Sequence, residues 1–278
     1  MTVAAYDDHE VALLFEEIRG AYGYDFRGYS RSSMRQNLAR HMAKARLSSL
    51  AQLRGRIRSD AGAFAGLLED LTIRVTEMFR DPEFFAALRR LVVPLLRARA
   101  GLRLWIAGCA TGEEVHSAAI LLHEEGLLDR ARLYATDLCP AALERAREGI
   151  YPAGQMRGWG ESYRRAGGTD SFAGYFTVAH GYAAIRPELI RNVHFAGHDL
   201  TGDEVFGEMD AVLCRNVLIH FDRDLRAHAL ALLGRSLPAG GFLCLGSREQ
   251  PAAHRHLYDD FAPAARIFRK RAAAGAAP

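Results

Sequence analysis

Residues 104–122 read LWIAGCATGEEVHSAAILL, and the architecture of the larger part of the chain follows from them. The first letters form a short apolar run typical of a buried strand. Gly108 and Gly112 mark a tight turn, and the apolar spacing after Val115 is typical of a helix. Nucleotide-binding α/β folds use this order to present backbone N–H groups to a ligand. The pattern therefore predicts a ligand site at the turn.

From residue 100 onward, short apolar runs alternate with helical patterns. The runs end in Gly, Asp or Asn, or in Gly followed by Ser, and they are LRLWIAG, ARLYATD, NVHFAG, DAVLCRN and GFLCLGS. This alternation predicts a mostly parallel sheet with helices on both faces and a ligand at the carboxyl ends of its strands. RIFRK, at 266–270, is expected to add a last strand.

Residues 150–190 interrupt this rhythm, since they are rich in Gly and aromatic residues and show no helical period. Within them YFTVAHGYAAIR predicts a β-hairpin around His180-Gly181. We therefore expect an α/β domain over 101–278 with a small antiparallel β insertion at about 151–190. It is preceded by a helical domain over 1–75 and by a linker with a connecting helix over 76–100.

The helical domain carries an unusual charge pattern. Residues 27–58 contain nine Lys or Arg and no Asp or Glu. Arg31 with Arg35, and Arg40 with Lys44, lie four residues apart, so each pair shares a helix face. Like charges repel unless an anion lies opposite them. A solvated surface is the plainer interpretation, but the absence of acids favours docking to a polyanionic helix or a nucleic acid.

Composition places the chain among ordinary globular proteins, with 49% apolar residues, 25% charged residues and a net charge of +3 over 278 residues. The acidic N-terminus is unlike a signal peptide, and no apolar run is long enough to span a bilayer. A cytoplasmic location is expected. The four cysteines are far apart and lack metal-ligand spacing, which predicts buried free thiols without a disulfide or a metal.

The residues around the turn narrow the ligand. The Walker pattern and the dinucleotide fingerprint GxGxxG are both absent, and Glu113 and Glu114 stand where a phosphate site needs cations. The next strand ends in Asp137, and an acid there accepts hydrogen bonds from ribose hydroxyls. A ligand with a ribose, a positive charge and no phosphate is indicated, which points to S-adenosylmethionine (AdoMet). Alternatively, the two glutamates only complement the helix dipole.

Four segments, GCATGEEVHSAAILL, YATDLCPAALERAREGIYP, VTEMFRDPEFF and DAVLCRNVLIHFD, together resemble the CheR family of chemotaxis methyltransferases. The resemblance covers roughly the whole chain. It implies an all-α N-terminal domain followed by a Rossmann-like AdoMet-dependent methyltransferase sheet with a β-subdomain insertion. It also implies methyl transfer from AdoMet to glutamate side chains on the cytoplasmic helices of a methyl-accepting chemoreceptor, with S-adenosylhomocysteine (AdoHcy) as product. The β insertion provides an edge strand for a receptor tail peptide in members that tether one.

The resemblance also assigns roles to individual residues. Arg80 and Arg215 are expected to position a carboxylate of the cofactor or the substrate. The basic residues Arg31, Arg35, Arg40 and Lys44 are expected to contact the receptor. The expected cofactor contacts, which include the turn glycine, are Arg74, Thr76, Arg80, Gly108, Glu113, Asp137, Asp199, Leu200, Arg215 and Asn216.

Three residues depart from the family pattern, in which Arg74 and Asp199 are usually Asn and His220 is usually Tyr. These departures keep open an alternative function, a signalling module that binds AdoMet or AdoHcy with little turnover. His116 and His220 both lie in apolar runs, which favours packed side chains over catalysts.

A nucleic-acid methyltransferase is a second alternative, but basic residues do not interleave with aromatics as base-stacking surfaces require. Glutamate methylation needs no general base, because the carboxylate, with a pKa of about 4.3, is already ionised at neutral pH. This agrees with the lack of a recognisable nucleophile–base motif.

Overall fold

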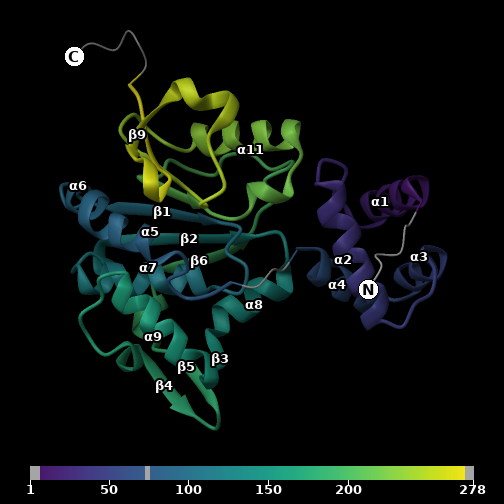
Figure 1. The fold of residues 1–278 in the computed structure, drawn as a ribbon, viewed down its shortest axis with the longest axis horizontal. Coiled ribbons are helices and arrows are strands. Elements are labelled where there is room, and N and C mark those ends of the chain that lie inside the picture. The colour runs from purple at the N-terminus through teal and green to yellow at the C-terminus, as the bar shows by residue number, and fades with distance from the viewer. Residues whose placement is uncertain (1–6, 73–75, 273–278) are drawn as a thin grey trace.

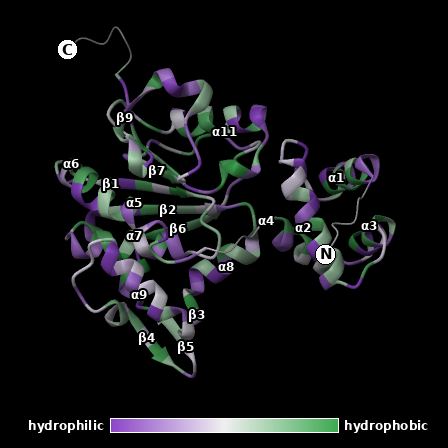
Figure 2. Cartoon of the chain, viewed as in Figure 1, coloured by the Kyte–Doolittle hydropathy of each residue, from purple (hydrophilic) through white to green (hydrophobic). Residues whose placement is uncertain are grey.

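The structure is a computed structural model that describes residues 7–72 and 76–272. A small helical domain stands beside a larger α/β domain (Figure 1). The helices of the small domain are α1 (Asp8–Tyr22), α2 (Arg31–Lys44), α3 (Leu50–Ser59) and α4 (Ala61–Thr72). Hydrophobic and hydrophilic residues alternate along these helices, as amphipathic helices around one core require (Figure 2).

The α/β domain is built on one seven-stranded sheet with the order β6-β2-β1-β7-β8-β10-β9. Strands β6, β2, β1, β7 and β8 pair in parallel, and β10 pairs antiparallel with β8 and β9. The strands are β1 (Leu102–Ala107), β2 (Ala131–Asp137), β6 (Val193–Gly197), β7 (Ala211–Cys214), β8 (Phe242–Leu245), β9 (Tyr258–Ala262) and β10 (Ile267–Lys270). The predicted mostly parallel sheet is confirmed, and RIFRK contributes its β10.

Helices cover the sheet and bury its apolar side chains in two core clusters. They are α5 (Pro82–Ala87), α6 (Val93–Leu96), α7 (Glu113–Glu124), α8 (Pro140–Glu148) and α11 (Arg223–Arg235). A π-helical turn over Leu88–Val92 joins α5 to α6, and short 3-10 turns occupy Leu128–Arg130, Ala153–Gln155, Phe172–Tyr175, Leu218–His220, Ala252–Leu257 and Pro263–Ala265. All four cysteines are buried and free, as predicted. Within residues 7–72 and 76–272, no helix is long and apolar enough to cross a membrane.

The β insertion forms a separate three-stranded antiparallel sheet with the order β3-β5-β4. Its strands are β3 (Ile150–Pro152), β4 (Phe176–Ala179) and β5 (Tyr182–Ile185). The predicted hairpin is confirmed, and its two-residue turn has φ of 50° at His180 and 81° at Gly181, as a type I′ turn requires.

One expectation for the insertion is wrong, because it contains helices α9 (Met156–Arg165) and α10 (Pro187–Ile190). In α9 the side chains that face the core are Trp159 and Tyr163, four residues apart and both buried. Gly158 and Gly160 weaken the local helical pattern, so tertiary packing rather than propensity forms this helix.

Candidate functional site

A cavity lies at the carboxyl ends of β1, β2, β6 and β7, where ligands of open α/β sheets bind. It encloses about 950 Å³ of space, part of it open to solvent. Eight of the expected cofactor residues line it: Thr76, Arg80, Gly108, Asp137, Asp199, Leu200, Arg215 and Asn216. Arg74 lies outside the described residues. The fold thus brings together positions spread over most of the α/β domain.

The glycine turn after β1 forms one wall of the cavity. The backbone N–H groups of Gly108 and Cys109 both donate to the carbonyl oxygen of Thr136 at the end of β2, at 2.8 and 2.9 Å. Gly108 has φ +72°, and a Cβ there would lie 2.4 Å from Cγ2 of Val217. Position 108 therefore needs glycine both for its backbone conformation and for the close approach of the loop after β7.

Asp137, the last residue of β2, holds the glycine turn after β1 through hydrogen bonds. Its Oδ2 accepts from the N–H of Ala110 at 2.8 Å, and its Oδ1 accepts from the N–H of Cys139 at 2.9 Å. Burial raises the pKa of the Asp137 carboxyl, and these hydrogen bonds oppose the rise. Each carboxylate oxygen can accept a further hydrogen bond, so the residue can both order the turn and bind a hydroxyl group in the cavity.

The two glutamates at the start of α7 have different surroundings. Glu114 lines the cavity, whereas Glu113 is not among the described lining residues. The Glu113 side chain is 6% exposed and accepts from the hydroxyl of Thr111 at 2.7 Å. Successive helical residues point about 100° apart, so the two side chains leave the helix in different directions. The cofactor contact expected of Glu113 stays a prediction, and Glu114 beside it lines the cavity.

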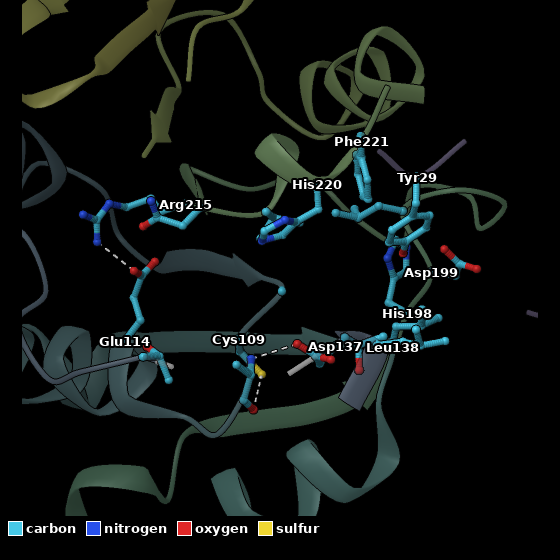
Figure 3. A pocket seen from close by; sticks show the side chains of 18 of the residues that line it. Tyr29, Cys109, Glu114, Asp137, Leu138, His198, Asp199, Arg215, His220 and Phe221 are labelled. Atoms are coloured by element: carbon cyan, nitrogen blue, oxygen red, sulfur yellow. Dashed lines mark hydrogen bonds and ion pairs between the residues drawn. The ribbon is translucent and has the colours of Figure 1, made fainter. Parts of the chain in front are cut away.

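Arg215, directly after β7, is the most enclosed charge of the site, with its side chain 1% exposed. Its Nη1 donates to Glu114 Oε2 and its Nη2 to Asp81 Oδ2, both at 2.7 Å, and Nη2 also donates to the carbonyl oxygen of Arg80. Its guanidinium carbon lies 4.0 Å from the ring centroid of Phe84. Arg215 therefore ties α7 to the segment before α5 and balances Glu114. Figure 3 shows this ion pair on one side of the cavity.

The segment before α5 adopts a constrained backbone. Phe79 and Asp81 have φ of 52° and 55°, a region that side chains other than glycine rarely occupy. The N–H of Phe79 donates to Oγ of Ser117 on α7 at 2.8 Å, which helps to hold this conformation. The constraint places Arg80, between the two, in the cavity wall.

Both domains of the chain match models of one protein family. Residues 9–72 match the all-alpha domain of the CheR methyltransferases, and residues 74–263 match their SAM-binding domain, where SAM is AdoMet. The chain belongs to the CheR methyltransferase family.

Its relatives carry methyltransferase names. A "Putative methyltransferase Cher3" of Pseudomonas putida is 47% identical over 272 residues, which cover 97% of this chain and 100% of the relative. A "Chemotaxis protein methyltransferase" of Listeria innocua is 30% identical over 82% of this chain and 85% of its own. A "Probable biofilm formation methyltransferase WspC" of Pseudomonas aeruginosa is 29% identical over 90% of this chain and 61% of its own.

The residues of this CheR cavity fit AdoMet. Carboxylates of Glu114, Asp137 and Asp199 line it, and one of its two lining arginines, Arg215, is already paired within the chain. A phosphate ligand would meet these carboxylates unfavourably, whereas a sulfonium or ammonium cation would be stabilised. Asp137 stands where a ribose-binding acid is expected. Among the residues that the structure describes, no three His, Cys, Asp or Glu side chains gather as metal ligands.

The sequence predicts packed side chains for His116 and His220, but the two have different surroundings in the structure. His116 in α7 is fully buried, with Nδ1 2.8 Å from the hydroxyl of Tyr151, and burial lowers its pKa to about 4. His220 instead lines the CheR cavity and is only half-buried, so the expectation of simple packing does not hold for it. The loop after β7 turns its side chain toward the ligand space (Figure 3).

The N-terminal CheR domain also contributes to the cavity, through Tyr29, Leu71 and Thr72. Sequence reasoning missed these residues, and it missed His198 after β6 as well. Their sequence surroundings resemble those of any helix end or loop, since the partners they meet lie far away in the chain. Tyr29, Leu71 and Thr72 reach the cavity through the docking of the two domains, whereas His198 reaches it from the end of β6, next to Asp199.

AdoMet binding to this CheR cavity is expected to release protons at mildly acidic pH and to strengthen as the pH rises. Burial raises the pKa of Glu114, Asp137 and Asp199, so in the free protein these groups take up protons at a higher pH than exposed carboxyl groups do. A cation favours the ionised forms, lowers these pKa values and expels protons. Above the raised pKa values the carboxylates are already ionised, and the release disappears.

Calorimetry in two buffers of different ionisation enthalpy measures this release. We expect buffer-dependent heats at acidic pH that converge at alkaline pH, and a smaller release from an Asp199→Asn variant. Equal heats in both buffers at acidic pH would contradict the electrostatic account of the cavity.

Proposed function

We propose that this CheR methyltransferase transfers the methyl group of AdoMet to glutamate side chains of a helical, receptor-like protein and forms glutamate methyl esters and AdoHcy. The observation that carries the proposal is the acidic, glycine-lined cavity at the carboxyl ends of the strands of a SAM-binding domain. The names of several relatives, given as chemotaxis protein methyltransferases, support a receptor substrate.

The cofactor residues have separate tasks in this proposal. AdoMet, when bound, supplies an electrophilic methyl group. Asp137 binds the ribose, Glu114 balances positive charge, and Gly108 leaves room for the ligand against the backbone. Arg215 acts as a positioning residue, because its contacts with Glu114 and Asp81 hold the Glu114 carboxylate in place. Arg80 lines the cavity and is assigned to orient a carboxylate of cofactor or substrate.

The acceptor needs little chemical help from the enzyme. A glutamate carboxylate, with a pKa of about 4.3, is ionised at neutral pH, so no base has to remove a proton. The enzyme's task is to align this carboxylate and to exclude water from the reacting groups. Cys109 lines the cavity, but burial raises the pKa of its thiol well above the usual value, which argues against a thiolate nucleophile.

The surface of α2 is assigned to receptor docking, although part of its positive charge is balanced within the chain. The acid-free segment is balanced by acids of neighbouring helices, because Arg35 pairs with Asp8 of α1 and Lys44 with Asp70 of α4. Arg31, with its side chain 87% exposed, lies 4.0 Å from the same Asp8 that pairs with Arg35. One acid thus faces two arginines, and this pair and the exposed Arg40 leave positive charge on the helix. Complementary charge of this kind raises the encounter rate and orients an acidic coiled coil.

Charge reversal tests this docking surface. An Arg31→Glu, Arg40→Glu double variant should raise the KM for a receptor fragment about 10-fold or more while kcat and AdoHcy affinity stay unchanged. Arg132→Glu, which reverses an exposed arginine of β2 at the opposite end of the strand from the cavity, is the matched control. A KM equal to that of the control would separate α2 from substrate binding.

The β insertion is assigned to a receptor tail peptide. Strands β3 and β4 are the two edges of its sheet. Ile150 on β3 and Val178 on β4 are 52% and 55% exposed, and Tyr182 at the start of the central strand β5 is 56% exposed, which is unusual for large apolar side chains. An extended peptide could add a strand to such an edge and cover them.

The experiment that tests the function uses AdoMet labelled in its methyl group and cytoplasmic receptor fragments. Glutamate methyl esters release labelled methanol in base, whereas methylated bases or amines do not. Base-labile label on the receptor supports the proposal. Tight AdoHcy binding without any transfer would instead favour a signalling module that senses the cofactor.

A further inference from the structure

We propose that Tyr29 of the N-terminal domain is a direct ligand of AdoMet and AdoHcy, and that a clasp between residues 28–30 and 220–222 couples cofactor binding to the docking of the two domains. The inference rests on the proposed position of the cofactor in the cavity. It extends the site from the SAM-binding domain to a residue of the helical domain.

The clasp is a short antiparallel bridge between segments far apart in the sequence. The N–H of Ser30 donates to the carbonyl oxygen of His220 at 2.7 Å, and the N–H of Asp222 donates to the carbonyl oxygen of Gly28 at 2.8 Å. Tyr29 and Phe221 are paired between these bonds. A Cβ at Gly28 would lie 2.9 Å from the Leu225 side chain, so the two backbones approach closely.

The Tyr29 ring joins two hydrophobic cores. Its centroid lies 5.0 Å from that of Phe221 in the SAM-binding domain and 5.2 Å from that of Phe26 in the helical domain, in both cases edge to face. It packs against the buried cluster of the N-terminal helices and against the cluster on the α11 side of the sheet. The cost of separating the domains therefore includes the exposure of this ring.

Tyr29 also faces the ligand space. It lines the cavity, and Figure 3 shows it between Phe221 and Asp199. Within residues 7–72 and 76–272 its hydroxyl has no hydrogen bond. Burial, with the nearby charges of Asp199 and Asp137, raises its pKa, so the hydroxyl remains a hydrogen-bond donor at all physiological pH values. A half-buried donor turned toward a cavity gains from a ligand that accepts a hydrogen bond from it.

Coupling follows from this arrangement. A ligand that contacts Tyr29 together with Asp137 and Asp199 touches both domains, and it binds the docked arrangement better than a separated one. Helix α2 begins at Arg31, directly after its N-cap Ser30, so the clasp also fixes the proposed receptor-docking helix relative to the cavity. Occupancy of the cofactor site and the orientation of α2 are then linked.

Substitution of Tyr29 tests the contact. Calorimetry should show about tenfold or greater loss of AdoHcy affinity for Tyr29→Ala and a smaller loss for Tyr29→Phe, which keeps the ring. Tyr22→Ala is the control, because Tyr22 stacks on Phe64 within the helical domain and does not line the cavity. Wild-type affinity in a folded Tyr29→Ala variant would overturn the inference alone. Failure of the wild-type protein to bind AdoHcy would overturn the proposed function as well.

A second pair of variants tests the clasp. Ser30 has φ of −54°, which proline can adopt, so Ser30→Pro removes the N–H that His220 accepts, while Ser30→Ala keeps it. We expect AdoHcy to slow hydrogen exchange at the Asp222 amide in wild type and in Ser30→Ala, and much less in Ser30→Pro, whose AdoHcy affinity falls. Equal protection of this amide with and without AdoHcy in the wild-type protein would overturn the coupling.

Discussion

Asp137→Ala should weaken AdoHcy binding by roughly 10- to 100-fold, as measured by calorimetry. The substitution removes the carboxylate that is expected to accept from the ribose. It also leaves the N–H groups of Ala110 and Cys139 without their acceptor, so the glycine turn loses its support. Both effects act on the same ligand, which makes this the largest change in affinity expected from a single cavity residue.

Two further variants separate these effects from general destabilisation. Asp129→Ala removes an exposed acid near the other end of β2, which pairs with Arg191 at the surface, and it should bind AdoHcy like wild type. Asp137→Asn keeps an acceptor oxygen in the same place, and we expect an intermediate loss. Wild-type affinity in Asp137→Ala would show that the ribose lies elsewhere.

Arg215→Met should lower the free energy of unfolding by about 3–5 kcal/mol, because it leaves Glu114 buried without its partner. Asp81 loses the same partner, but it is more exposed and contributes less. Arg215→Lys should also be destabilised, since a single ammonium group cannot replace the two-pronged contact with Glu114 and Asp81. Urea unfolding measures these changes.

A double variant tests whether Glu114 is the cause. Arg215→Met combined with Glu114→Gln should recover part of the lost stability, because the second change removes the unpaired charge. An Arg215→Met variant that loses less than about 1 kcal/mol, with no recovery in the double variant, would contradict the central position given to this ion pair.

Much of the fold follows from local pattern. The five short apolar runs after residue 100 all became strands. Strands β1, β7 and β8 inside the sheet are almost wholly buried, which is why they are apolar nearly throughout. The His180-Gly181 turn was equally readable, because only a few residue pairs favour positive φ at both positions. Helix α9 was not readable, because its helix depends on the burial of Trp159 and Tyr163 against distant residues.

The site was predictable to the extent that strand ends meet at one edge of a sheet. Asp137 and Arg215 followed from this rule and from the resemblance to the family. The place of Glu114 in the cavity wall did not, because it depends on where the first turn of α7 starts after Gly112. Tyr29 was missed entirely, since nothing near it in the sequence indicates the loop at 220–222 that it meets.

The charge pattern of the helical domain gives a similar lesson. The lack of acids in residues 27–58 favours an anionic partner outside the chain. In the folded chain Asp8 and Asp70, from α1 and α4, supply much of the opposite charge. A count of charges along one segment omits the charges of other helices, whereas the interaction energy of a charge depends on its neighbours in space. The docking role of α2 therefore rests on its exposed cations, Arg31 and Arg40.

The most direct test of the account is a calorimetric titration of the purified chain with AdoMet, AdoHcy, ATP and NAD. The acidic cavity predicts saturable binding of the first two, which carry an adenosine and no phosphate, and no measurable binding of the phosphorylated nucleotides. Binding of ATP or NAD, with neither AdoMet nor AdoHcy bound, would contradict it.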